Sequence, residues 1–344
     1  MSVLFVTNHV PPERRGAFAA LHARVPIELA LFGGRSHHAT EGVEDPGVPH
    51  RHVAQRQLFG LAASGDYRAV VCGTAGRLAL PASYVGARRS ATPFVLWSAL
   101  WAQPRSPAHL AGALLLQRIY RDAEAVVAYG PHVAAPARRR GARGVHVAPP
   151  AVDQAFWSEP GLPPPPRAES TFLFVGRPAP EKGLEGLLRA WRASGLPAAA
   201  ARLGLVGGEP ALAPGDAIAA HPAADPVALR NFYAAADVLV VPSVPSPPYR
   251  EPWGLVVNEA MHQGLPIIAT DAVGAAAGGL VRHERNGLVV AAGDTVALAA
   301  ALRRLHEEPA LRRRMGIQAR RDVAAFSFDA WADGMAGALR FDRF

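Results

Sequence analysis

The sequence contains 344 residues, of which 50% are hydrophobic and 19% are charged, so the chain is long enough to bury two hydrophobic cores. The net charge of +8 favours anionic partners, but no aromatic residues are interleaved with the short arginine runs at residues 138–140 and 312–314, and we therefore expect no nucleic-acid binding. The one cysteine, Cys72, excludes an intramolecular disulfide bond and a zinc site built from cysteines.

Short apolar runs recur along the first half of the chain and predict buried parallel strands. The first is "VLFVT" at residues 3–7, which ends in a proline-rich loop. Segments with helical content, at residues 110–121 and 131–140, separate some of these runs. Such alternation is typical of a parallel sheet with helices on its faces. The other predicted strands of this half are residues 28–34, 67–73, 93–98, 123–130 and 144–150.

A proline-rich segment, "PGLPPPPRAES" at residues 160–170, interrupts this pattern. Four successive prolines cannot continue a helix or a central strand, so the segment predicts a stiff connector between two domains. The alternation then resumes. The predicted strands are residues 171–176, 201–207, 236–243, 265–271 and 287–292, and the predicted C-terminal helices are residues 295–307, 310–325 and 328–339.

The resulting fold class is α/β, with two Rossmann-like parallel-sheet domains that face each other across a cleft. Sheets of this kind bind ligands at the carboxyl ends of their strands. We place the domains at residues 1–162 and 171–326, with the connector at residues 163–170 between them. The C-terminal helix within residues 327–344 is expected to pack back on the first domain.

A first candidate site lies in "FVGRPAPEKGLEGLLRAW", residues 174–191. A predicted strand ends at Gly176 and Arg177 follows at its carboxyl edge, while Lys182 comes just before an apolar-periodic helix. Cations at this place suit a diphosphate, because arginine offers a two-pronged donor and lysine a point charge. A surface arginine and a lysine at a helix start would explain the same residues without a ligand.

Two glutamates flank the predicted start of another helix in "REPWGLVVNEAMHQG", residues 250–264. The backbone near Gly254 can approach a phosphate closely. Glu251 lies outside the helix and Glu259 about one turn inside it, so the two acids can accept hydrogen bonds from hydroxyls on both sides of a diphosphate. A nucleoside diphosphate sugar has this layout. A capping acid with an exposed mid-helix acid is the alternative.

Together these segments resemble glycosyltransferase family 4, whose members are retaining enzymes with the GT-B fold. The family's Glu-x7-Glu and Gly-Arg-x4-Lys-Gly motifs are both present, and residues 233–243 and 285–290 also resemble family segments. The resemblance covers most of the second domain. The residues that match the two motifs are Glu251 and Glu259, and Gly176, Arg177, Lys182 and Gly183.

The resemblance implies a role for each matched residue. Arg177 and Lys182 bind the donor diphosphate, Glu259 binds the ribose, and Glu251 binds hydroxyls of the donor sugar. Glu251, Arg177 and Lys182 are the implied catalytic residues. The further donor-binding positions in this domain are Gly176, Gly207, Trp253, Gly254, Leu255 and Val256.

The first domain, which grips the acceptor in this family, is matched more loosely. "NHVPPERRGAF", residues 8–18, resembles the family's glycine-rich loop, with donor-binding Gly16 in the second glycine's place and Arg15 in the first's. Family members often carry a histidine after the strand that is matched here by residues 93–98, and this chain has none there. The acceptor-side candidates are His9, Trp97 and Ser98.

The resemblance implies transfer of a sugar from a nucleoside diphosphate sugar to an acceptor hydroxyl, with retained anomeric configuration and a front-face displacement. UDP-sugars are the commonest donors in the family, and GDP-mannose comes next. We expect no metal and no other cofactor, since the nucleotide sugar is a co-substrate. The acceptor class is a small molecule or a glycan or lipid intermediate, and no oligomeric state is predicted. A sugar-nucleotide epimerase of the same fold and a glycan- or lipid-binding scaffold without turnover are the alternatives.

The sequence predicts a cytoplasmic protein, and its Ala, Arg and Pro content suggests a bacterial source. No stretch reaches the ~18 apolar residues of a membrane span, and the apolar run at residues 3–6 is shorter than the roughly 7–15 residues of a signal-peptide core. Leu110, Leu114, Leu115 and Ile119 follow a near-helical spacing. The favoured interpretation is a helix facing the core, and peripheral contact with an anionic membrane is the alternative.

Overall fold

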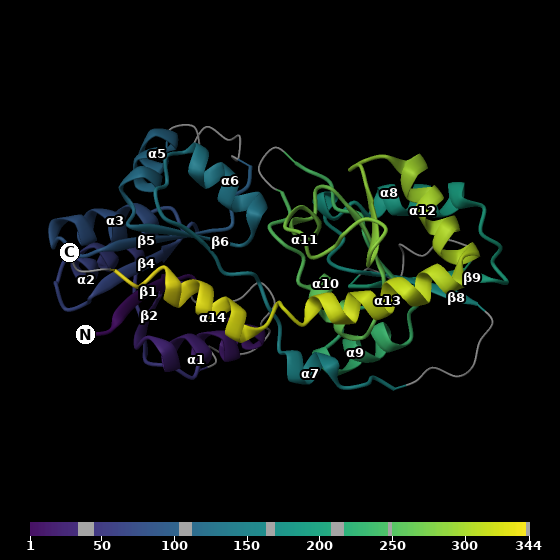
Figure 1. Ribbon diagram of the computed structural model, residues 1–344, viewed down its shortest axis with the longest axis horizontal. Coiled ribbons are helices and arrows are strands. Elements are labelled where there is room, and N and C mark those ends of the chain that lie inside the picture. Colours follow the sequence, from purple (N-terminus) through teal and green to yellow (C-terminus); the bar gives the residue numbers. More distant parts are fainter. Residues whose placement is uncertain (34–44, 103–111, 163–168, 208–216, 247–249, 342–344) are drawn as a thin grey trace. The chain divides into compact units, whose positions relative to one another are not determined.

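The structure is a computed structural model that describes residues 1–33, 45–102, 112–162, 169–207, 217–246 and 250–341 (Figure 1). The chain forms two compact units, each with its own parallel sheet. The first unit comprises Met1–Asp153 with Phe326–Phe344, and the second comprises Gln154–Ala325. The predicted α/β class with two parallel sheets is confirmed.

The sheet of the first unit is entirely parallel over its described strands, in the order β3-β2-β1-β4-β5-β6-β7. The strand order turns back at β1, so the connections on its two sides lie on opposite faces of the sheet. The strands are β1 (Val3–Thr7), β2 (Ile27–Leu31), β3 (His50–His52), β4 (Ala69–Gly73), β5 (Phe94–Ser98), β6 (Ala125–Ala128) and β7 (Val145–Val147).

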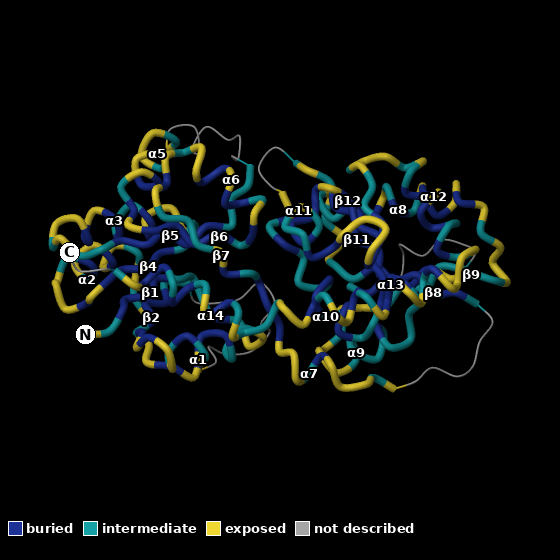
Figure 2. The backbone as a smooth tube through the Cα atoms, in the orientation of Figure 1, coloured by how far each residue is buried: buried dark blue, intermediate teal, exposed yellow. Residues whose placement is uncertain are grey.

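Helices cover both faces of this sheet. Val3 and Phe5 of β1 pack in one core with α1 and α14, whereas Leu4 and Val6 pack in the other with α2, α3 and α5. Side chains alternate along a strand, so one apolar run serves both cores, and Figure 2 shows the strands as the buried layer. The helices are η1 (Pro12–Arg14), α1 (Arg15–Arg24), η2 (Gln55–Gln57), α2 (Leu58–Ala62), α3 (Ala79–Arg89), α5 (Ala113–Asp122), α6 (Pro131–Arg139) and α14 (Phe328–Gly337).

The sheet of the second unit is also parallel over its described strands, and its strand order also turns back at its first strand. The order is β10-β9-β8-β11-β12-β13. From β8 the chain builds outward through β9 and β10, and then returns to the other side of β8 with β11. The strands are β8 (Ser170–Val175), β9 (Ala201–Val206), β10 (Ile218–His221), β11 (Val238–Val241), β12 (Ile267–Thr270) and β13 (Gly287–Val290).

Two helices of the second unit, α8 and α12, pack against each other and share a core with its sheet (Figure 1). In α8, Leu184, Leu187 and Trp191 recur at helical spacing and are buried. A second group places α10 against α7, α9 and α13. The helices are α7 (Gln154–Ser158), η3 (Pro180–Lys182), α8 (Leu184–Ser194), α9 (Pro226–Ala234), α10 (Val256–His262), α11 (Gly274–Ala277), α12 (Thr295–Glu307) and α13 (Pro309–Val323).

The first unit ends at Asp153, ahead of the predicted domain end at residue 162. The reason is that α7 packs on α10. The Ser158 hydroxyl and His262 Nδ1 lie 3.1 Å apart at hydrogen-bond distance, and Gln263 Nε2 donates to the Glu159 carbonyl at 2.8 Å. Such contacts between distant residues leave no sequence pattern. The four prolines of the predicted connector lie outside the described residues.

The C-terminal helix α14 belongs to the first unit and packs against α1 and β7. Arg24 of α1 donates to Asp329 at 2.7 Å and to Asp333 at 2.6 Å. Gly334 lies so close to β7 that an added Cβ would be 2.1 Å from the Val147 carbonyl oxygen. The last helix therefore completes the core of the unit in which the chain begins.

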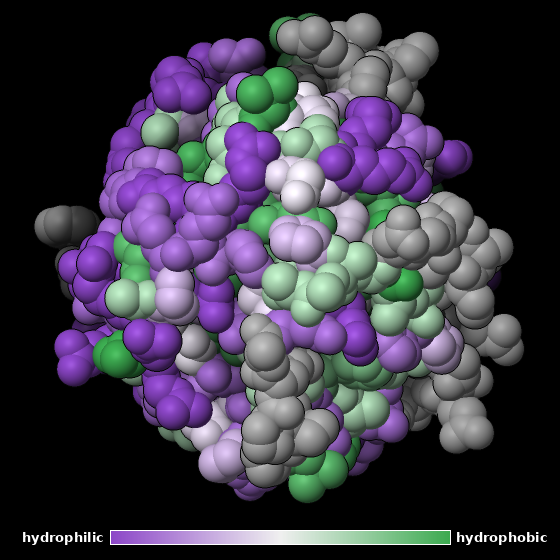
Figure 3. Space-filling model, turned by 90° about the vertical axis from the view of Figure 1, so that its right-hand side faces the viewer, coloured by the Kyte–Doolittle hydropathy of each residue, from purple (hydrophilic) through white to green (hydrophobic). Residues whose placement is uncertain are grey.

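The surface of the first unit corrects part of one expectation. Ile119 of α5 is buried, but Leu114 is 81% exposed and Leu115 40% exposed, so only part of the apolar stripe faces the core. Leu110 lies outside the described residues. No helix in the described ranges is both long and apolar enough to span a membrane. Over the second unit, the face seen in Figure 3 is mostly hydrophilic around small hydrophobic areas.

Buried His262 makes the stability of the second unit depend on pH. Burial, and secondarily the charge of Arg320, lower the pKa of His262 from 6.5 to about 4. In the unfolded chain this histidine binds a proton near pH 6.5, whereas in the folded chain it stays neutral down to about pH 4. The free energy of unfolding therefore falls as the pH drops from about 6.5 toward 4. We expect the thermal midpoint to decrease more between pH 7 and pH 5 in the wild type than in His262→Gln. His52→Gln, at an exposed position on β3, should keep the wild-type decrease, and equal decreases in all three proteins would contradict the prediction.

Candidate functional site

The two sequence motifs meet at the carboxyl ends of β8 and β11 through one residue of each, Lys182 and Glu251. These strands are neighbours in the sheet, although 62 residues lie between the end of β8 at Val175 and the start of β11 at Val238, and this intervening chain builds β9 and β10. Strand order diverges between β8 and β11, and ligands of open parallel sheets bind at such a point. The Gly176 to Gly183 loop follows β8, and the Glu251 to Leu255 turn lies between β11 and α10.

The centre of this site is an ion pair between Lys182 and Glu251. Lys182 Nζ donates to Glu251 Oε2, and the two side chains are 22% and 8% exposed. The Lys182 chain passes over the end of β8, because a Cβ added to Gly176 would lie 4.0 Å from Lys182 Cδ. A cation and an acid removed from water interact more strongly than they would at the surface.

Gly183 fixes the loop that carries Lys182. Its φ of +72° is left-handed, and an added Cβ would lie 2.0 Å from the Pro242 carbonyl oxygen, just after β11. The Val244 amide also donates to the Glu181 carbonyl at 2.9 Å. The loop after β8 is therefore seated directly on the segment after β11.

The turn that carries Glu251 is held from the other side by α11. Glu251 forms an isolated parallel bridge with Val273, and its carbonyl accepts from the Gly274 amide at 3.1 Å. The Trp253 carbonyl accepts from the Ala275 amide at 2.8 Å. These bonds fix the backbone position of the acid.

Trp253 anchors the same turn through its side chain. It is 2% exposed, and its indole N–H donates to Asn258 Oδ1 at 2.7 Å. Gly254 then adopts φ +88°, Leu255 caps α10, and Val256 begins it. The helix spans seven residues, fewer than residues 255–263 predicted, so its dipole is a smaller source of positive potential than the sequence suggested.

Glu259 is positioned by a residue to which sequence reasoning assigned no role. The Tyr233 hydroxyl donates to Glu259 Oε2 at 2.7 Å. Burial, followed by the nearby carboxylate, raises the pKa of Tyr233 well above its ordinary value, so the phenol stays protonated and remains a donor. The only signal in the sequence was its position in a segment that resembles the family.

Arg177 differs from Lys182 in being exposed. Its side chain is 62% exposed and lies 4.0 Å from Glu181, a weak surface pair. Gly207 follows the end of β9, and an added Cβ there would be 2.8 Å from the Gly176 carbonyl oxygen. Close approach of two strand ends is thus one reason for this glycine. In the part of the chain that the structure describes, no three His, Cys, Asp or Glu side chains are grouped to hold a metal ion.

The acceptor-side candidates belong to the first unit, at the carboxyl end of its sheet. Trp97, at the end of β5, is 7% exposed, and among the described residues its indole N–H has no acceptor. The Arg14 guanidinium lies 5.8 Å from the Trp97 ring centre and 5.9 Å from that of Tyr129, and it donates to the Tyr129 hydroxyl at 3.4 Å. Tyr129 is the main cause that raises the pKa of Arg14. Neither Arg14 nor Tyr129 was predicted.

Two first-unit candidates, Ser98 and Gly16, make close contacts within that unit. Ser98 is fully buried, its hydroxyl is 2.7 Å from that of Tyr120, and it accepts from the Leu100 amide at 3.2 Å. Gly16 lies inside α1, and an added Cβ would be 2.4 Å from the Phe328 ring. His9 follows β1 and is partly buried.

Comparisons with known proteins relate the chain to glycosyltransferases. The family model described as Glycosyl transferases group 1 matches residues 169–308. D-inositol 3-phosphate glycosyltransferase of Streptomyces avermitilis is 36% identical over 145 residues, which are 41% of this chain and 27% of that protein. Sucrose-phosphate synthase from Thermosynechococcus elongatus has a TM-score of 0.75 at 22% identity, over 99% of this chain and 98% of that one. Anabaena HepE in complex with UDP-glucose has a TM-score of 0.74 at 18% identity, over 98% and 99%.

These comparisons differ in what they cover. The chain spans 27% and 41% of the length of the first two curated relatives, whereas the structural likeness extends over nearly the whole chain. The shared fold is GT-B, as the sequence resemblance implied. Residues 169–308, which form most of the second unit, are thus similar to glycosyl transferases group 1.

Proposed function

We propose that the protein transfers a sugar from a nucleoside diphosphate sugar to an acceptor hydroxyl and retains the configuration at the anomeric carbon. The observation that carries this proposal is the Lys182–Glu251 pair at the meeting point of β8 and β11. It places a phosphate-binding cation and a hydroxyl-binding acid side by side, where a parallel sheet receives its ligand. Glu259 adds a second acid further along α10.

Each group has a separate part of the donor to bind. Arg177 and Lys182 hold the diphosphate, and Glu251 accepts hydrogen bonds from the donor sugar. Glu259 accepts them from the ribose, and the Tyr233 hydroxyl on its Oε2 atom fixes the orientation of that carboxylate. The Lys182 ammonium is held in place by its pair with Glu251, so the protein itself fixes the position of this charge.

The reaction that suits these groups is a front-face displacement. The bond between the anomeric carbon and the diphosphate oxygen breaks, and the acceptor oxygen bonds to the anomeric carbon on the same face. The acceptor proton passes to the departing diphosphate oxygen. Arg177 and Lys182 stabilise the negative charge that develops on this leaving group, and no protein nucleophile is needed.

The relatives suggest which substrates to test first. HepE was solved with UDP-glucose, which favours a UDP-sugar as donor over GDP-mannose. The curated relatives are named D-inositol 3-phosphate glycosyltransferases, so the hydroxyl of a phosphorylated polyol is the first acceptor to test. Other small molecules and glycan or lipid intermediates follow.

The proposal is tested by donor binding and by turnover. A thermal-shift panel of UDP-, GDP-, ADP- and dTDP-sugars should identify one nucleotide, because a ligand at a hundred times its Kd stabilises by about 2.7 kcal/mol. That donor should then release nucleoside diphosphate slowly without acceptor and faster with it, and Glu251→Ala should abolish the release. Stabilisation without any release would favour a binding scaffold, and no stabilisation by any donor would overturn the proposal.

Turnover is expected to be independent of divalent metal. Arg177 and Lys182 supply two positive charges for the diphosphate, which is the electrostatic task that a metal ion performs in other transferases. Dialysis against EDTA should therefore change kcat by less than about twofold. A loss of activity that added Mg²⁺ or Mn²⁺ restores would contradict this prediction.

We also propose a cytoplasmic location with peripheral membrane contact through α5. Leu114 and Leu115 are exposed there, and Arg121, about two turns further along the same helix, is also exposed. The protein should sediment with phosphatidylglycerol vesicles at low salt, and the double variant Leu114→Glu/Leu115→Glu should sediment several-fold less. Val296→Glu, at a 78% exposed position on α12, is the matched control. Absence of sedimentation for the wild type would end the membrane proposal.

A further inference from the structure

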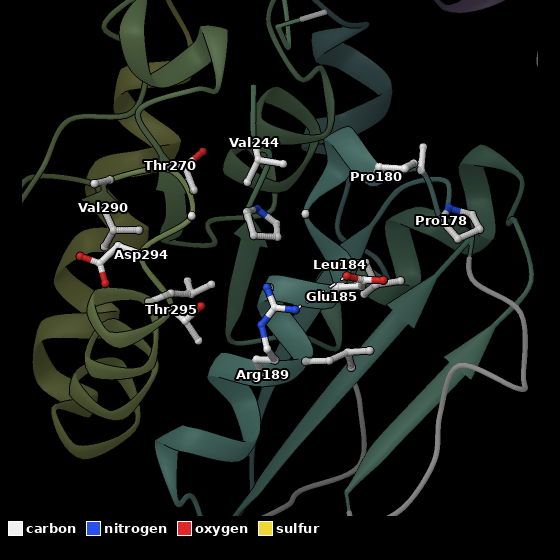
Figure 4. Close-up of a pocket in the computed structure, with 18 residues that line it drawn as sticks. Pro178, Pro180, Leu184, Glu185, Arg189, Val244, Thr270, Val290, Asp294 and Thr295 are labelled. Atoms are coloured by element: carbon white, nitrogen blue, oxygen red, sulfur yellow. Dashed lines mark ion pairs between the residues drawn. The ribbon is translucent and has the colours of Figure 1, made fainter. Parts of the chain in front are cut away.

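A cavity of about 340 Å³ lies in the second unit, between the first turns of α8 and α12 (Figure 4). Its size falls in the range of small-molecule sites, which is about 300–1,000 Å³. The carboxyl ends of β11, β12 and β13 contribute Pro242, Thr270 and Val290 to its wall. The proposed reaction does not use this space.

The walls of the cavity are mainly apolar. Leu184 and Leu298 are buried members of the core between helices and sheet, while Leu188 and Val290 pack against that core and remain partly exposed. A ligand that covers partly exposed apolar side chains in such a concave space removes their surface from water. This stabilises the complex by about 25 cal/mol per Å² of apolar surface buried.

One cation projects into this apolar space. Figure 4 shows the Arg189 guanidinium extending from α8 between the two helices. Arg189 pairs with Glu185 at 3.7 Å, but the side chains are 62% and 93% exposed, so the pair is weak. The other acid of the lining, Asp294, caps α12 by accepting from the Ala297 amide at 2.8 Å. Arg189 is therefore the group best placed to bind the charge of a ligand.

The cavity is separate from the donor cluster, although one loop borders both. None of Arg177, Lys182, Glu251 and Glu259 lines it, whereas Pro178, Pro180 and Gly183 of the intervening loop do. A ligand in the cavity would contact the loop that carries Lys182 from the side of α8 and α12.

We propose that this cavity binds a small carboxylate with an apolar body, such as a medium-chain fatty acid. The carboxylate forms a forked hydrogen-bonded pair with Arg189, and the chain lies against Leu188, Val290 and Leu298. The guanidinium selects the acid over the corresponding alcohol, because a carboxylate offers a negative charge and two oxygens for its forked donors, whereas an alcohol offers one neutral oxygen.

The test is calorimetric titration of the full chain with octanoate and with 1-octanol. Octanoate is expected to bind saturably and more tightly than octanol. Arg189→Gln should weaken octanoate binding by at least about tenfold and leave octanol binding unchanged. Arg192→Gln, an exposed arginine one turn further along α8 that does not line the cavity, is the matched control and should bind as the wild type does.

Two variants that fill the cavity distinguish binding inside it from adsorption of the ligand elsewhere on the protein surface. Leu298→Trp projects from the buried core into the cavity, and Leu188→Phe does so from a partly exposed position that tolerates the larger side chain more readily. Whichever variant folds with a wild-type circular dichroism spectrum should lose binding of both ligands. The proposal is overturned if octanoate shows no saturable binding, if Arg189→Gln and Arg192→Gln behave alike, or if a folded filling variant binds octanoate as the wild type does.

Discussion

Lys182→Ala is expected to lower kcat/KM by about 10²–10³, equivalent to about 2.7–4 kcal/mol of transition-state stabilisation, the typical effect of removing one preorganised donor from developing charge. Lys182 reaches the end of β8 from a loop seated on the segment after β11, and its side chain is only 22% exposed. In the Lys182→Ala variant, water can therefore compensate only poorly for the lost positive charge. The measurement is initial-rate kinetics with the donor identified by thermal shift, and part of the loss should appear in kcat.

Arg192→Gln removes a positive charge on the helix that follows, outside the site, and should keep kcat/KM within about twofold of the wild type. Wild-type kinetics for Lys182→Ala would contradict the assigned role.

A double-mutant cycle then separates chemistry from folding at the same pair. Lys182→Met and Glu251→Gln each leave one member of a largely buried ion pair without its partner, which destabilises the protein beyond the loss of the pair itself. The double variant should recover part of that stability, whereas its activity should be no higher than that of the weaker single variant. Additive losses of stability would show that the two side chains do not interact.

Gly183→Ala is expected to destabilise the second unit and to reduce activity by more than tenfold. The left-handed conformation alone costs a non-glycine residue about 1–2 kcal/mol. In addition, the new Cβ would lie 2.0 Å from the Pro242 carbonyl oxygen, so the loop with Lys182 must move away from β11. Thermal unfolding should show a midpoint lower by several degrees, and the donor affinity should fall with it.

Gly195→Ala is the matched control for this substitution. Gly195 ends the same helix with φ +65°, but an added Cβ there meets nothing within 4 Å. The Gly195→Ala variant therefore has the energetic cost of a left-handed non-glycine residue. Its new Cβ collides with nothing, and Lys182 is not displaced. A similar loss of activity in both variants would show that the close approach of Gly183 to Pro242 does not matter for the site.

Much of the second unit could be predicted because its signals are local. Apolar runs alternate with helix-periodic segments, and α12, for example, was predicted with the bounds that the structure has. The edge strands β3 and β10 were not predicted. Both are short, and their residues are exposed or partly buried, so they lack the apolar run that marks a central strand.

The candidate site likewise has features that the sequence shows and features that only the structure shows. The spacing of Glu251 and Glu259 and the order of Arg177 and Lys182 are visible in the chain, and they were sufficient to predict a diphosphate-binding site. The contact of Lys182 with Glu251 was not visible, since 69 residues separate them. The same holds for the Tyr233 hydrogen bond that orients Glu259.

The sequence by itself determined the α/β class, the repeated strand and helix order, and the identity of the charged residues in the second unit, because these depend on local periodicity and spacing. Only the tertiary structure decided that the first unit ends at Asp153, that Ser98 is held by Tyr120, and that Arg14 lies over the Trp97 ring. The physical reason is that packing and hydrogen bonding join side chains whose separation along the chain carries no pattern. Strand order in each sheet brings them together, and no short stretch of residues encodes that order.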